Sequence, residues 1–160
     1  MIVELRNETF VITANEQLVE LYIDGELQSL TNGDNWTLPD YTQLQPTDRL
    51  IALKATNMDD PQCSGVLASV YDGSLLTNGA WKCTQLEEVN WANLGFDASS
   101  WPNAVQYGSN GNHIQCDQQQ FFGDISSNSQ WIWTADLDNN LTVYCRGYLR
   151  ECNFYNVKDI

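Results

Sequence analysis

The feature that most constrains the fold of this chain is a hydrophobic pattern with a period of two residues. Short segments rich in β-branched and aromatic side chains follow this pattern, and Gly, Asn, Asp or Pro bounds them. They cover residues 10–14, 18–23, 49–56, 65–71, 80–84, 130–135 and 141–149. A period of two is typical of β-strands, whereas an amphipathic helix has a period of about 3.6. The pattern therefore predicts an all-β fold, either a sandwich or a barrel.

Turn dipeptides separate these segments. Asp24-Gly25 is the strongest hairpin signal, and further turns are predicted at Asn32-Gly33, Asp72-Gly73, Asn78-Gly79 and Asn110-Gly111. Residues 86–96 allow a short helical turn, Asp97 is placed to cap the turn that follows, and the polar segment 109–128 is expected to be a loop at the end of the sandwich. The 160 residues contain no internal repeat or linker, which predicts one domain over residues 1–160.

The cysteines indicate disulfide bonds. They are Cys63, Cys83, Cys116, Cys145 and Cys152. No CxxC pair occurs and the chain has one histidine, so a zinc site or a redox dithiol lacks ligands. A hairpin between the first two favours a Cys63–Cys83 bond, and Cys145 would then pair with Cys116 or Cys152. Disulfides predict an oxidising, extracellular compartment.

Glycosylation sequons and net charge agree with a secreted protein. The sequons begin at Asn7, Asn35 and Asn140. Lys and Arg number 7 against 21 Asp and Glu, so the formal net charge is -14. Binding of nucleic acid and of anionic membranes depends on Lys and Arg neutralising phosphate, which excludes both as partners. The apolar runs are also too short for membrane insertion.

Several strings in order resemble the galactose-binding-like β-jelly-roll domains, which include lectin-like modules of secreted metazoan proteins and accessory modules of bacterial rhamnosidase-type enzymes. They are LYIDGELQ (21–28), RLIALKATN (49–57), GVLAS (65–69), WKCT (81–84), GFDASSWPNA (95–104) and WIWTADLDNNLTVYCRGYL (131–149). The resemblance covers about residues 10–149. It implies two antiparallel sheets, often with a structural calcium ion, and a ligand site in loops at one end. The sugar and metal ligands of rhamnose-binding modules have no matching positions here.

Catalysis is not indicated by the residues. A nucleophilic triad needs a poised base, and the single histidine, His113, lies in a polar loop without a motif around it. His113 is therefore expected to be an exposed loop residue, with a ligand contact as the alternative. The chain is predicted not to be an enzyme.

Calcium is the metal that the acidic composition favours, because it takes carboxylate and amide oxygen ligands. Asn57, Asp59 and Asp60 follow a strand directly, and Asp24, Asp34 and Asp97 are further candidates for such a site. The segment 136–140 begins like an EF-hand loop but lacks the glycine and glutamate that such a loop needs, so it is predicted to be a hairpin turn.

Aromatic residues provide the candidate ligand platforms. The tryptophans expected to belong to the scaffold are Trp36, Trp81, Trp101, Trp131 and Trp133. Those left as candidate ligand contacts are Trp91 as a free platform, with Tyr41, Tyr107, Phe121 and Phe122 in loops. Arg146 is expected to pair with a buried acid.

These observations predict an extracellular, non-enzymatic binding module that recognises carbohydrate, with calcium as a candidate cofactor. A carrier of a small apolar ligand such as a pigment or lipid is the alternative, based on Phe121-Phe122 and Phe154-Tyr155. A matrix or adhesion role through an unpaired cysteine also stays open, as does a homo-oligomer.

Overall fold

The computed structural model of the protein describes residues 8–139 and 141–150, and these form two antiparallel β-sheets of five strands each. The strands are β1 (Thr9–Ala14), β2 (Gln17–Ile23), β3 (Glu26–Leu27), β4 (Asp40–Gln43), β5 (Leu50–Thr56), β6 (Val66–Val70), β7 (Lys82–Thr84), β8 (Val105–Ser109), β9 (Gln130–Trp133) and β10 (Thr142–Tyr148). Sheet A has the order β4-β1-β6-β9-β8, and sheet B has the order β3-β2-β5-β10-β7. The predicted all-β sandwich is confirmed.

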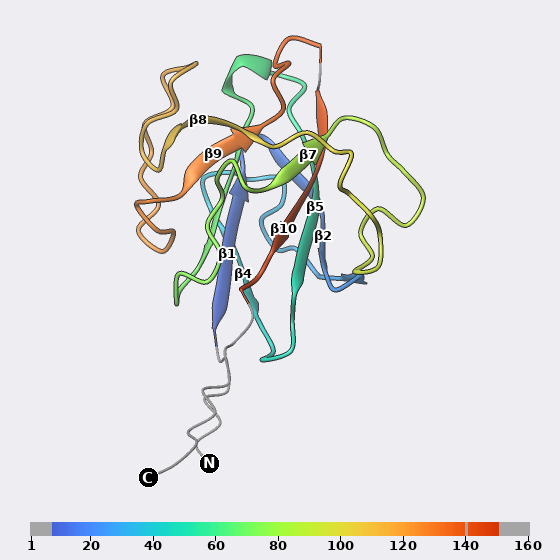
Figure 1. Ribbon diagram of the computed structural model, residues 1–160. Helices are drawn as coiled ribbons and strands as arrows, with labels where there is room; N and C mark the ends of the chain where they lie inside the picture. The colour runs from blue at the N-terminus through green and yellow to red at the C-terminus, as the bar shows by residue number, and fades with distance from the viewer. Residues whose placement is uncertain (1–7, 140, 151–160) are drawn as a thin grey trace.

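The two sheets share one main hydrophobic core, to which both contribute fully buried strand residues such as Ile12, Leu67, Leu53 and Trp133. A single short 3₁₀ helix, η1 (Pro61–Cys63), lies at one end of the sandwich in the described residues (Figure 1). No helix in residues 8–139 and 141–150 has the length and apolar character needed to span a bilayer.

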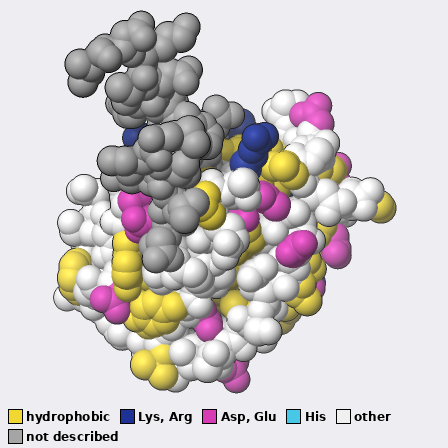
Figure 2. All heavy atoms as spheres, turned by 90° about the horizontal axis from the view of Figure 1, so that it is seen from below, with side chains coloured by type: hydrophobic (Ala, Val, Ile, Leu, Met, Phe, Trp, Pro, Cys, Tyr) yellow, Lys and Arg dark blue, Asp and Glu magenta, His cyan; other side chains and the backbone are white. Residues whose placement is uncertain are grey.

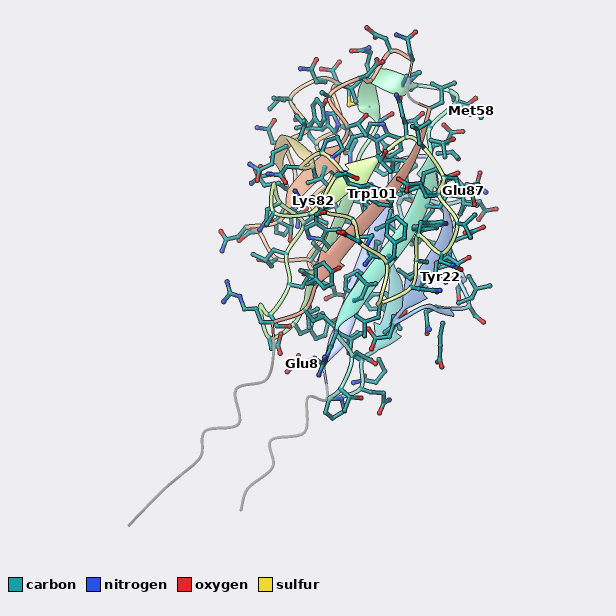
Figure 3. The ribbon with its side chains drawn as sticks, turned by 45° about the vertical axis from the view of Figure 1, so that its right-hand side comes forward. Glu8, Tyr22, Met58, Lys82, Glu87 and Trp101 are labelled. Carbon is teal, nitrogen blue, oxygen red and sulfur yellow. A yellow bond between two sulfur atoms is a disulfide. The ribbon has the colours of Figure 1, made fainter. Side chains whose placement is uncertain are left out.

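Long irregular segments explain why some strands are apolar on both faces. Strand β6 is buried at every position and β5 at most of them. A second apolar cluster lies on the side of sheet B away from the core, where Ala52 and Tyr144 of the strands contact Trp91 and Trp101 of the segment 85–104. Figure 3 shows Trp101, Glu87 and Tyr22 lying over the strands of this sheet. Strands covered on both faces lose the alternation of apolar and polar side chains.

Arg146 holds the segment 85–104 against sheet B. Its guanidinium is 1% exposed, and Nη1 donates hydrogen bonds to the carbonyls of Trp91 (2.5 Å) and Asn93 (2.9 Å). Nη2 donates to the Phe96 carbonyl (3.3 Å) and to the hydroxyl of Tyr148 (2.9 Å). The expectation of a buried acid as partner is therefore wrong: backbone carbonyls, which also carry partial negative charge, accept the hydrogen bonds.

The disulfides differ from the pairing favoured by the sequence. Cys63 is bonded to Cys116, and Cys83 to Cys145. The predicted Cys63–Cys83 bond is wrong because β7 lies beside β10, where Cys83 and Cys145 are direct cross-strand partners. Cys152 lies outside the described residues. Two disulfides are compatible with an extracellular protein.

Most turns lie where the turn dipeptides predict them, whereas the irregular segments differ from the sequence prediction. Asp24 (φ 49°) and Gly25 (φ 85°) both have positive φ, which is the geometry of a type I′ hairpin turn, and they join β2 to β3. Residues 86–96 form irregular turns rather than a helical turn. Strand β8 lies within a stretch for which no strand was predicted, because its glycine and polar residues mask the alternation.

Candidate functional site

A pocket of about 950 Å³ lies at the end of the sandwich that carries η1. Four segments distant in sequence form it: the β1–β2 turn, the residues around Trp36, the segment around η1, and the loop around Cys116. The lining residues are Asn15, Glu16, Asp34, Trp36, Asn57, Asp59, Asp60, Gln62, Cys63, Gln115, Cys116, Asp117 and Gln118. This set combines an indole, carboxylates and amides. It is called the end pocket below.

Trp36 provides the aromatic wall of the end pocket. It is half-buried, packs against the main core, and makes an edge contact with Phe122 at 6.4 Å between ring centroids. Its carbonyl accepts a hydrogen bond of 2.6 Å from the Thr13 hydroxyl, which ties this segment to β1. The neighbouring Asp34 is exposed at the pocket. The backbone is therefore fixed while part of the indole faces the pocket.

The turn between β1 and β2 forms a second wall. Asn15 is buried, and its side-chain amide donates to the Cys63 carbonyl (2.6 Å). Glu16 has φ 78°, a left-handed conformation that a non-glycine residue rarely adopts. Its carboxylate accepts a hydrogen bond from the Asp59 amide (3.0 Å). Strained residues of this kind concentrate at functional sites.

The strand end after β5 contributes the predicted metal ligands Asn57, Asp59 and Asp60. Asn57 is 2% exposed, and its Oδ1 accepts a hydrogen bond from the Asp60 amide (3.0 Å), which fixes the turn before η1. Asp59 and Asp60 are exposed at the pocket. Asn57 therefore has a structural role, and the two aspartates provide negative charge at the rim.

The residues predicted as calcium ligands lie at different places in the fold. Asp97 does not line the end pocket: its carboxylate accepts hydrogen bonds from the Ser99 hydroxyl and from the Ser99 amide (2.9 Å), and these bonds lower the pKa of Asp97. Asp24 accepts from the amides of Arg49 (3.0 Å) and Leu50 (2.7 Å) and so stabilises its turn. In the described part of the chain, no three His, Cys, Asp or Glu side chains gather in a way that could hold a metal ion.

The loop around Cys116 forms the remaining wall and is fixed by two features. One is the Cys63–Cys116 disulfide, which joins the loop to η1. The other is Gln118, which is 9% exposed: its Oε1 accepts from the Gln120 amide (2.6 Å) and its carbonyl accepts from the His113 amide (3.1 Å). The Nε2 donor of Gln118 has no hydrogen-bond partner. An unpaired buried donor is uncommon and calls for an explanation.

His113 is buried rather than exposed, so the expectation of an exposed loop residue is wrong. Its ring is 2% exposed and stacks on Tyr107 with centroids 5.8 Å apart. Nδ1 accepts a hydrogen bond from the Gln115 amide (3.2 Å), so Nε2 carries the proton and donates to the Ser64 carbonyl (2.9 Å). Desolvation lowers the pKa of His113 below 6.5, which favours the neutral ring. The imidazole is a scaffold for the pocket loop.

Three of the predicted aromatic platforms are buried. Trp91 is 6% exposed and lies between Tyr22 and Tyr144, with centroids at 5.5 and 5.0 Å. It is therefore not a free platform, because Arg146 anchors its backbone to sheet B. Tyr107 is 6% exposed and Phe122 3%. Burial of Phe122 also removes the exposed Phe121-Phe122 pair that supported an apolar carrier, and Phe154-Tyr155 lies outside the described residues.

Tyr41 and Phe121 are exposed, as predicted for loop platforms, although Tyr41 lies on strand β4. The Tyr41 hydroxyl donates to Asp124 (2.7 Å), and this hydrogen bond raises the pKa of Tyr41 to about 12. Neither residue lines the end pocket.

Of the sequons, only Asn35-Trp36-Thr37 lies within the described residues. Asn35 is exposed, and its Oδ1 accepts a hydrogen bond from the Thr37 hydroxyl (2.6 Å). Because Asp34 and Trp36 both line the end pocket, a glycan on Asn35 would leave the chain at the pocket rim. Asn7 and Asn140 lie outside the described residues.

Comparison with protein-family models, with curated proteins and with solved structures finds no match to this chain. The resemblance to galactose-binding-like domains therefore stays a prediction.

Proposed function

We propose that this protein is a secreted, non-enzymatic carbohydrate-binding module whose ligand site is the end pocket. The observation that carries the proposal is the combination of a half-buried indole with carboxylates and amides around one concave surface. A sugar presents an apolar face of C–H groups and a rim of hydroxyls, so a protein site for it needs an aromatic surface and a few placed polar groups.

The rigidity of the end pocket supports binding. The Cys63–Cys116 disulfide, the amide of Asn15 and the buried His113 fix three of its walls before a ligand arrives. A preformed site loses little conformational freedom on binding, which favours affinity for small ligands. Calcium stays a prediction, as does a homo-oligomer.

The opposite end of the sandwich offers a contrast. Figure 2 shows that end, where acidic side chains are scattered singly among apolar and uncharged side chains. A smaller pocket of about 310 Å³ between Ile23 and Asp48 has no aromatic lining residue among the described residues. The end pocket is therefore the better sugar site.

The test is a glycan array followed by calorimetry on the glycans that bind, with and without a calcium chelator. Trp36→Leu is expected to reduce affinity roughly five- to 150-fold, if stacking of a sugar ring on the indole is worth the ~1–3 kcal/mol found for bases stacked on aromatic side chains. Tyr71→Leu, an exposed aromatic just after β6 at the opposite end, is the matched control and should bind normally. An array without signal on any glycan would contradict the proposal.

A further inference from the structure

The end pocket has a strongly one-sided charge. Five carboxylates line it, from Glu16, Asp34, Asp59, Asp60 and Asp117, and no lysine or arginine is among its described lining residues. No ion pair joins these carboxylates to a Lys or Arg in the described part of the chain. Four of the five are exposed, so they are open to a ligand. Such a surface attracts a cation and repels an anion.

Trp36 restricts the ligand class further. An indole face binds the C–H face of a pyranose, and it also attracts an ammonium group through its quadrupole. The carboxylates and the indole together favour one chemistry: a cation that also carries an apolar ring face.

We propose that the end pocket binds a sugar with a protonated amine, namely an unacetylated hexosamine. The carboxylates at the rim bind the ammonium group, and the Trp36 indole contacts the sugar ring. This inference rests on the proposed carbohydrate-binding function. Acidic sugars, such as uronic acids and sulfated sugars, are excluded from the pocket by the same carboxylates.

The experiment compares two disaccharides by calorimetry: β-1,4-linked glucosamine disaccharide and its N-acetylated counterpart, which lacks the positive charge. The free-amine form is expected to bind at least about tenfold more tightly at low ionic strength, and the difference should shrink in high salt. Equal affinity for the two would overturn the amine inference and leave the proposed function standing. If neither disaccharide binds but another glycan does on the array, the inference fails alone. If no glycan binds, both fail.

Matched variants separate pocket charge from the net charge of the protein. Asp34→Asn with Asp117→Asn removes two charges at the pocket, and Asp72→Asn with Asp124→Asn removes two elsewhere while keeping their acceptor oxygens for Ser74 and Tyr41. The pocket pair should lose most of the preference for the free amine and the control pair should keep it. An equal loss in both would overturn the inference, because the attraction would then come from the whole protein. The inference is also overturned if calcium displaces the disaccharides from the pocket and the free-amine and N-acetylated forms bind with equal affinity.

Discussion

At the scale of single residues, His113 shows how a buried group links pH to stability. Its ring is neutral in the folded protein and both nitrogens are hydrogen-bonded, with Nε2 to Ser64 and Nδ1 to Gln115. Protonation of Nδ1 breaks the second bond and places a charge in a desolvated site. The folded protein therefore takes up this proton at a lower pH than the unfolded chain does.

The resulting prediction concerns the free energy of unfolding. Because the pKa of His113 is lowered on folding from 6.5, its contribution is fully present above about pH 6.5 and is lost as the pH falls through the folded-state pKa. Urea unfolding between pH 8 and about 5.5, where few carboxylates titrate, measures it. His113→Gln should flatten this dependence, since it is the one histidine of the chain. The same slope in that variant would show that another group is responsible.

Arg146 is a second residue whose burial has a large energetic consequence. Its guanidinium satisfies the carbonyls of Trp91, Asn93 and Phe96, and it also lies over the Phe96 ring at 5.3 Å. Arg146→Met should destabilise the protein by roughly 3 kcal/mol, because it leaves buried carbonyls unpaired. Arg49→Met, at an exposed position, is the control.

The Arg146→Met variant also distinguishes local loosening of one segment from destabilisation of the whole fold. Hydrogen exchange should become faster first in the segment 85–104, which Arg146 holds onto sheet B. Uniform acceleration over both sheets, without a local change in that segment, would contradict the anchoring role.

At the scale of elements, the two disulfides act on different parts of the structure. Cys83–Cys145 is fully buried and joins the short edge strand β7 to β10. Cys63–Cys116 lines the end pocket, and Cys116 is partly exposed. Thiol–disulfide exchange requires access to a sulfur atom, so the two bonds should differ in reactivity.

Mild reduction of the native protein is therefore expected to open Cys63–Cys116 first. Differential alkylation with mass spectrometry identifies the reduced pair, and the partly reduced protein should keep its β-sheet circular dichroism while ligand affinity falls. A first cleavage at Cys83–Cys145 would contradict this order.

Most strands could be predicted from the sequence because β1, β2, β5, β6 and β10 carry long alternating or continuous apolar runs with turn residues at their ends. Strands β3, β4 and β8 could not, since β3 has two residues, β4 has the short polar sequence DYTQ, and β8 contains Gly108 with φ 113°. The Cys83–Cys145 pairing depends on which strands are neighbours in sheet B. Sequence spacing does not contain that information.

At the scale of the whole molecule, the candidate site was only partly predicted because the fold brings together segments that are distant in sequence. Asp59 and Asp60 were identified because they follow a strand, and Asp34 because it is acidic. The family-like pattern predicts Trp36 as scaffold, and the indole does pack on the core. Its role as a pocket wall appears only when the sandwich brings four distant loops to one end.

The end pocket is the proposed ligand site. Chemical-shift mapping by ¹H–¹⁵N NMR on the ¹⁵N-labelled protein, titrated with glucosamine disaccharide, tests this proposal most directly. The shifted amides are expected to cluster at Glu16, Asp34, Trp36, Asp59 and Gln118. Shifts confined to the segment 85–104 or to the opposite end of the sandwich would contradict it.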